Sequence, residues 1–102
     1  MSEELVSIRH VVVRGRVQGV GYRARTEYAA RKLGLGGWVR NRRDGTVEAV
    51  FTGPAHLVGR MVEQCRRGPP ASWVDAVDHR EGNRDDLALR REGENFSVLP
   101  TV

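Results

Sequence analysis

The sequence predicts an α+β fold in which an antiparallel sheet carries two helices on one face. Three observations predict this fold. Runs rich in β-branched residues alternate with two runs of helix-forming residues. Asp44-Gly45 separates two extended runs, which is a strong signal for a hairpin turn. The 102 residues suffice for one domain and are too few for two.

The chain is expected to open with a strand and a helix. Residues 5–14 are rich in β-branched side chains and are bounded by Gly15, so we expect the strand to end there. Residues 23–33 are strong helix formers, and Gly34 is placed to cap that helix. The helix face that we expect to be buried consists of Tyr22, Thr26, Ala29, Ala30 and Leu33.

A hairpin over residues 36–53 and a second helix come next. The inward face of the second hairpin run consists of Val47, Ala49 and Phe51. We expect Pro54 in the first turn of the helix, where its missing N–H does no harm. The apolar stripe of the helix consists of Leu57, Val58, Met61, Val62 and Cys65. Gly68-Pro69-Pro70 ends the helix.

The last third of the chain adds strand and loop. Residues 72–80 predict a fourth strand, and the polar residues 82–95 predict mostly loop. Phe96 and Val98 predict a short extra terminal strand. The resulting order of β-α-β-β-α-β is the ferredoxin-like plan, an antiparallel sheet with both helices on one face. This plan hosts many functions, so it does not decide the function by itself.

Charge is unevenly distributed along the chain. The net charge is +4, and arginine supplies 16 of the 17 basic residues. Residues 1–51 carry +5 and residues 52–102 carry −1, so we expect an anionic partner to bind the first half. The single Cys65 excludes an internal disulfide, no apolar run reaches membrane-spanning length, and the acidic start does not resemble a signal peptide. We therefore expect a cytoplasmic protein without a membrane partner.

The stretch GRVQGVGYR at residues 15–23 joins the first strand to the first helix. It lacks the Gly-Lys-Ser/Thr triplet of a Walker A loop. Gly19, Gly21 and Ala24 fit the dinucleotide pattern G-x-G-x-x-A, but a hairpin follows where that fold requires a parallel strand. Neither nucleotide-binding interpretation therefore fits the whole chain.

A third interpretation of this stretch is a free-standing anion site. Glycines allow successive backbone N–H groups to converge, and the positive end of a helix lies at the same place. Arg23 adds a planar guanidinium that matches two phosphate oxygens. In the alternative, the glycines only make a tight connection and Arg23 lies on the surface. That alternative leaves Gln18 and Val20 unexplained.

Asn41 lies three residues before the hairpin turn, in a run that is otherwise suited to a strand. Asparagine has poor β-propensity. One explanation is that Asn41 starts the turn early. The functional explanation is that its neutral amide, which both donates and accepts hydrogen bonds, holds a water beside the anion.

Both stretches resemble the signature motifs of the acylphosphatase family. The first is similar to G-x-V-Q-G-V-x-F-R, with matches at Gly15, Val17, Gln18, Gly19, Val20, Tyr22 and Arg23. The second is similar to G-W-V-x-N-x-x-x-G-x-V, with matches at Gly37, Trp38, Val39, Asn41, Gly45, Val47 and, further on, Gly53. The similarity covers roughly residues 8–99 and implies one domain over residues 1–102. Tyr22 replaces the more usual phenylalanine, so we expect altered hydrogen bonding near the loop.

The resemblance implies hydrolysis of acyl phosphates to a carboxylate and inorganic phosphate. It also implies that the inorganic phosphate inhibits the reaction. It places the phosphate loop at Gln18, Gly19, Val20, Gly21, Tyr22 and Arg23, with Arg23 binding phosphate and Asn41 positioning water. The implied mechanism is in-line attack of that water without metal or cofactor. We expect a monomer that does not bind nucleic acid.

Other prominent residues have structural explanations. The histidines His10, His56 and His79 lack metal-ligand spacing, and Cys65 lies on an apolar stripe. We expect a solvated strand face from Arg40, Arg42 and Arg43.

Two alternatives to an enzyme stay open, because the fold and a pI of about 10.2 also suit a nucleic-acid-binding module or a regulatory domain without catalysis. An RNA-recognition sheet, however, needs exposed aromatic residues that the run HVVVRG does not supply.

Overall fold

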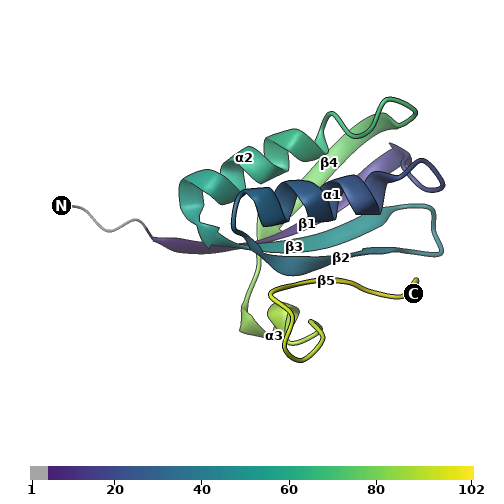
Figure 1. The fold of residues 1–102 in the computed structure, drawn as a ribbon. Helices are drawn as coiled ribbons and strands as arrows, with labels where there is room; N and C mark the ends of the chain where they lie inside the picture. Colours follow the sequence, from purple (N-terminus) through teal and green to yellow (C-terminus); the bar gives the residue numbers. More distant parts are fainter. Residues whose placement is uncertain (1–4) are drawn as a thin grey trace.

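The computed structural model of the protein describes residues 5–102, and residues 1–4 of the predicted domain lie outside that range. Its elements in chain order are β1 (Val6–Arg16), α1 (Tyr22–Lys32), β2 (Gly36–Asn41), β3 (Val47–Pro54), α2 (Ala55–Cys65), β4 (Trp73–Glu81), α3 (Arg84–Leu87) and β5 (Phe96–Val98). The strand order in the sheet is β4-β1-β3-β2-β5. Helices α1 and α2 cover one face of the sheet (Figure 1). This arrangement confirms the predicted ferredoxin-like fold.

The terminal strand differs from the expected antiparallel sheet. β1 is antiparallel to both β3 and β4, and β2 is antiparallel to β3. β5 instead lies parallel to β2, with Phe96 beside Gly37 and Val98 beside Val39. The orientation differs because residues 82–95 carry the chain below the sheet and back to the β2 edge (Figure 1).

β1 is longer than expected, because it continues past Gly15 to Arg16. Its register with β4 shifts between Arg14 and Gly15, as in a β-bulge. Gly15 has a φ of 128°, and a Cβ at this position would collide with the backbone oxygen of Trp73. Gly15 therefore permits close approach to β4, and the loop begins only after Arg16.

The main core lies between the sheet and the two long helices. The sheet contributes Val11, Val13, Val39, Val47, Ala49 and Phe51, all buried, and the helices contribute Ala30, Val58, Met61, Val62 and Cys65. Both predicted helix faces therefore point inward. Full burial of one large apolar side chain contributes about 1.5–3 kcal/mol, so this interface dominates the stability of the fold. α2 begins at Ala55, so Pro54 precedes the helix as its N-cap and does not lie in its first turn.

A second, smaller core lies on the opposite face of the sheet, where Leu87 packs against the buried Trp38 and Val50. The segment 82–95, expected to be mostly loop, contains the short helix α3. In its capping box, Asn83 accepts from the N–H of Asp86, and Asp86 accepts from the N–H of Asn83. The indole Nε1 of Trp38 donates to the backbone oxygen of Asp86, which fixes α3 beneath β2.

Arg40 and Arg42 do not form the solvated face that we expected, because both contact the buried Glu48. Arg40 Nε lies 2.8 Å and Arg42 Nη1 lies 3.1 Å from Oε1 of Glu48. His10 Nε2 lies 2.7 Å from the other carboxylate oxygen. Burial alone would raise the pKa of Glu48, but hydrogen bonds with His10, Arg40 and Arg42 outweigh it and hold the pKa below its ordinary value.

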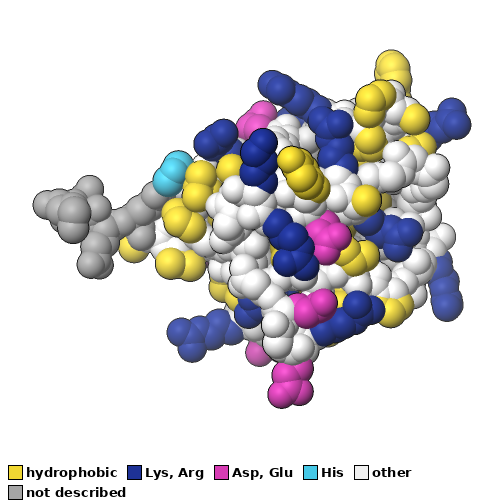
Figure 2. All heavy atoms as spheres, in the orientation of Figure 1, with side chains coloured by type: hydrophobic (Ala, Val, Ile, Leu, Met, Phe, Trp, Pro, Cys, Tyr) yellow, Lys and Arg dark blue, Asp and Glu magenta, His cyan; other side chains and the backbone are white. Residues whose placement is uncertain are grey.

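The surface mixes both signs of charge. On the face drawn in Figure 2, Lys and Arg side chains are spread among Asp and Glu side chains and do not gather in one patch. Within residues 5–102, none of the helices has both the length and the apolar character needed to cross a membrane.

Candidate active site

The loop before α1 presents backbone N–H groups that no side chain caps. Gly21 is the N-cap of α1 with φ 82°, and Gly19 has φ 72°, so both adopt the left-handed conformation that favours glycine. No side chain caps this helix end, and no acidic residue lies in the first turn. The first N–H groups of a helix have no partner within the helix, so this end carries a partial positive charge that attracts anions.

Three of the six predicted loop residues turn their side chains away from this end of the helix. Gln18 Nε2 donates to the backbone oxygens of Arg42 and Thr46, at 2.6 and 2.9 Å. Val20 packs against the main core. Tyr22 is also buried in that core. For these three residues, only the backbone amides remain to bind an anion.

The hydroxyl oxygen of Tyr22 is tolerated in the core because it has a hydrogen-bond partner there. It donates a hydrogen bond to the backbone oxygen of Cys65 in α2. Burial raises the pKa of Tyr22 well above its ordinary value, so the phenol stays neutral. Burial likewise raises the pKa of the Cys65 thiol to about 12. The hydrogen bonding altered by this tyrosine therefore lies between α1 and α2 and not in the loop.

Arg23 is half-buried in the first turn of α1 and is available to a ligand. Among residues 5–102 no side chain or carbonyl group accepts a hydrogen bond from it, and no carboxylate forms an ion pair with it. Glu27, one turn further along the helix, pairs with Arg31 at 3.2 Å. The guanidinium of Arg23 therefore keeps all of its donors for an anion.

Asn41 is the last residue of β2 and pairs with Val47 across the hairpin. Its backbone oxygen accepts a hydrogen bond from the N–H of Val102 at 3.2 Å. Its side-chain Oδ1 is buried and has no hydrogen-bond partner, and no other buried side-chain oxygen or nitrogen in the described part of the chain shares this condition. An unsatisfied buried acceptor costs about 1–3 kcal/mol, so its retention calls for an explanation.

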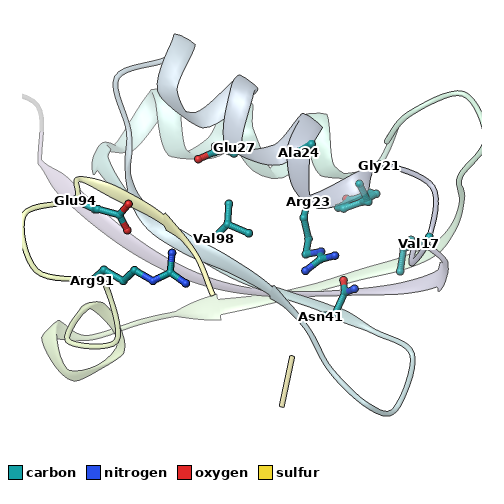
Figure 3. Close-up of a pocket in the computed structure, with 11 residues that line it drawn as sticks. Val17, Gly21, Arg23, Ala24, Glu27, Asn41, Arg91, Glu94 and Val98 are labelled. Atoms are coloured by element: carbon teal, nitrogen blue, oxygen red, sulfur yellow. The ribbon is translucent and has the colours of Figure 1, made fainter. Parts of the chain in front are cut away.

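One pocket of about 470 Å³ brings these groups together. Of the predicted site residues, it is lined by Gly19, Gly21, Tyr22, Arg23 and Asn41. Figure 3 shows the Arg23 guanidinium and the Asn41 amide pointing toward one another, one from α1 and the other from β2. Gln18 and Val20 do not line the pocket. The two sequence stretches thus form a single site.

The pocket also has a second side, which the sequence did not predict. Arg91, Glu94 and Val98 line it from the segment that leads into β5. The sequence carries a strand signal at Phe96 and Val98, but no local signal shows that β5 joins the β2 edge. That pairing connects residues about sixty positions apart, so only the folded chain reveals it.

The geometry suits anion binding next to a free hydrogen-bond acceptor. Arg23 and the start of α1 supply positive charge, and Asn41 Oδ1 supplies a free acceptor. Within residues 5–102, no group of three His, Cys, Asp or Glu side chains is placed to hold a metal ion. His10 is committed to Glu48.

The family model that matches this chain, two similar sequences and a similar solved structure are all of acylphosphatases. The acylphosphatase family model matches residues 9–96. An acylphosphatase of Bradyrhizobium diazoefficiens is 60% identical over 96 residues, which cover 94% of this chain and 97% of that protein. An acylphosphatase of Rhodopseudomonas palustris (strain BisB18) is 59% identical over 93% of this chain and 96% of its own length. The solved acylphosphatase of Coxiella burnetii superposes with a TM-score of 0.81 at 31% identity, covering 97% of this chain and 100% of that one.

Proposed function

The chain belongs to the acylphosphatase family and is an enzyme of acyl phosphate hydrolysis, and from that premise we propose that Arg23 and Asn41 carry out the reaction in the pocket at the start of α1. One observation carries the proposal. The buried Oδ1 of Asn41 has no hydrogen-bond partner, and it belongs to the same pocket as the uncommitted Arg23.

In the first step, the phosphate of the substrate binds at the loop. Arg23 donates two hydrogen bonds to phosphate oxygens, and backbone N–H groups of residues 18–23 donate further ones. Each charge-assisted hydrogen bond contributes about 1.5–3 kcal/mol. Several of them hold a phosphate dianion by positive charge from the protein itself, so this scheme needs neither a metal nor a cofactor.

In the second step, Asn41 positions the attacking water. The free Oδ1 accepts a hydrogen bond from the water, which orients a lone pair of the water oxygen toward phosphorus. Positioning of this kind lowers the barrier because the reacting atoms are held in line before reaction. A bound water would also satisfy the buried oxygen, which explains why the acceptor is retained.

The bond changes balance without a general acid. The water oxygen forms a bond to phosphorus while the bond from phosphorus to the acyl oxygen breaks. The carboxylate leaves with that electron pair, and the water proton passes to a phosphate oxygen of the substrate. A carboxylate is a stable anion, so its departure needs no proton. The protein therefore acts by positioning and by electrostatic stabilisation of the transferred phosphoryl group.

The positions of the exposed aromatic residues favour the enzyme over a nucleic-acid-binding module. An RNA-recognition sheet stacks bases on aromatic side chains of its central strands. The exposed aromatic side chains among residues 5–102 are Tyr28 and Trp73, on α1 and on the edge strand β4. We therefore retain a small acyl phosphate as the partner and keep a cytoplasmic monomer of one domain as our expectation.

The test is hydrolysis of acetyl phosphate and benzoyl phosphate by the purified chain in the presence of a chelator. We expect turnover, with competitive inhibition by inorganic phosphate. Loss of turnover in chelator, restored by a divalent metal, would contradict the metal-independent scheme. Absence of turnover together with salt-sensitive RNA binding would favour the nucleic-acid-binding module.

A further inference from the structure

The pocket extends well beyond the space needed for a phosphate group. Its second side consists of Arg91, Glu94 and Val98. In Figure 3, Val98 lies between the Arg91 side chain and the pair formed by Arg23 and Asn41. An acyl phosphate bound at Arg23 therefore has its acyl group directed along Val98 when it extends into the rest of the pocket.

A fully buried serine holds this second side in place. Ser97 Oγ accepts a hydrogen bond from the N–H of Arg91 at 3.0 Å. The same hydroxyl donates to Oε1 of Glu94 at 2.8 Å. Ser97 itself is buried in β5 with no exposed surface. The backbone of Arg91 and the carboxylate of Glu94 are thus fixed to the sheet edge.

The charges on this side leave one cation uncommitted. Glu27 pairs with Arg31, and Glu94 accepts from Ser97. The guanidinium of Arg91 has neither a hydrogen-bond acceptor nor an ion-pair partner among residues 5–102. Its neighbour Arg90 differs, because Arg90 Nη1 donates to the backbone oxygen of Asn95 at 3.2 Å. The free binding capacity at this end of the pocket is therefore that of a cation.

We propose that Arg91 forms a second anion subsite, so that the enzyme prefers acyl phosphates whose acyl chain ends in a carboxylate. The inference rests on the proposed function, because it places the phosphate at Arg23. A short methylene chain then lies against Val98, and the terminal carboxylate binds the Arg91 guanidinium in the two-pronged geometry that this pair favours. Acyl chains of the same length with an uncharged end lack that contact.

The test compares two substrates of equal chain length, freshly prepared and corrected for spontaneous hydrolysis. Succinyl phosphate carries the distal carboxylate, and butyryl phosphate does not. We expect the wild-type protein to have the higher kcat/KM for succinyl phosphate. Arg91→Gln lowers that preference by about fivefold, which is the size of effect that an exposed ion pair contributes. The same variant leaves kcat/KM for butyryl phosphate unchanged. Arg91→Lys retains part of the preference.

The matched control is Arg84→Gln, because Arg84 is exposed on α3 and lies outside the pocket. It leaves the substrate preference unchanged. The inference is overturned if Arg91→Gln retains the wild-type preference for succinyl phosphate. It is also overturned if Arg91→Gln lowers kcat/KM for both substrates and weakens inhibition by phosphate in parallel. If the wild-type protein hydrolyses both substrates with equal kcat/KM, the subsite alone is overturned. If it hydrolyses neither substrate, the proposed function itself is overturned.

Discussion

Nε2 of Gln18 lies 2.6 Å from the backbone oxygen of Arg42, and this hydrogen bond ties the loop before α1 to the hairpin beside Asn41. The same nitrogen donates to the backbone oxygen of Thr46 at 2.9 Å. The phosphate-binding and water-positioning groups of our proposal come from separate segments of the chain. The Gln18 side chain bonds these two segments together, so we expect it to help position Arg23 relative to Asn41.

Gln18→Ala is therefore expected to reduce activity although Gln18 does not line the pocket. Two neutral hydrogen bonds are lost, so the free energy of unfolding falls by about 1–2 kcal/mol. The value of kcat/KM falls by about tenfold, because small misplacements of reacting groups are costly. Urea unfolding and acetyl phosphate kinetics measure the two effects. Gln64→Ala, at an exposed position of α2, is the control. Full activity with reduced stability would show that Gln18 only stabilises the fold.

Arg23→Ala is expected to abolish both turnover and phosphate binding, because it removes the one side-chain cation at the loop end of the pocket. Stability changes little, since Arg23 has no partner among residues 5–102. Phosphate binding is measured by calorimetry, and Arg25→Ala, on the same helix but outside this pocket, is the control. Activity of Arg23→Ala within about threefold of wild type would be incompatible with its role.

Asn41→Ala is expected to separate catalysis from binding. Without the oxygen that holds the water, kcat falls by about 10²–10³-fold, as for loss of one preorganised hydrogen bond. Phosphate affinity is retained, because Arg23 and the loop amides are unchanged. The free energy of unfolding does not fall, because the buried Oδ1 has no partner to lose. A parallel decrease of kcat and phosphate affinity would rule out the water-positioning role.

The order of the helices and strands was predictable because local signals mark each element. Helix-forming residues mark α1, the Asp44-Gly45 dipeptide marks the hairpin, and an apolar stripe marks α2. The short helix α3 also carries a local signal, since Asn83 and Asp86 have the spacing of a capping box. The polar composition of residues 82–95 nevertheless favours a loop over a helix.

Other features depend on contacts between distant segments. Gly15 was expected to end β1, but its positive φ instead serves a bulge against β4, which requires knowledge of the partner strand. The parallel pairing of β5 brings Arg91 and Val98 to the pocket, and no local pattern predicts it. The two loop motifs located Arg23 and Asn41, whereas the second side of the pocket required the structure.

Tyr22→Phe is expected to leave activity unchanged. The Tyr22 hydroxyl contacts the backbone oxygen of Cys65 in the core, away from the loop. Loss of one buried hydrogen bond lowers the free energy of unfolding by about 1 kcal/mol. Kinetics with acetyl phosphate and thermal unfolding measure the two quantities. An altered KM for acetyl phosphate would show that the hydroxyl influences the loop.

The acid stability of the fold is expected to depend on Glu48. Its folded pKa is below its ordinary value of 4.5, so its ionised form is favoured by folding. The resulting stability is complete above pH 4.5 and is lost as the pH falls through the folded-state pKa. The groups that face its carboxylate are His10 on β1, Arg40 on β2 and Arg42, the first residue after β2.

Glu48→Gln removes this acid dependence. At neutral pH the free energy of unfolding falls by about 2 kcal/mol, less than for a fully buried pair, because the Arg42 side chain is 40% exposed. The difference between wild type and variant shrinks as the pH falls below 4.5, because wild-type Glu48 then becomes protonated. Urea unfolding across this pH range measures the difference. Asp78→Asn is the control, because Asp78 pairs with Arg14 on the exposed surface. A difference that stays constant with pH would mean that Glu48 contributes through its shape and not through its charge.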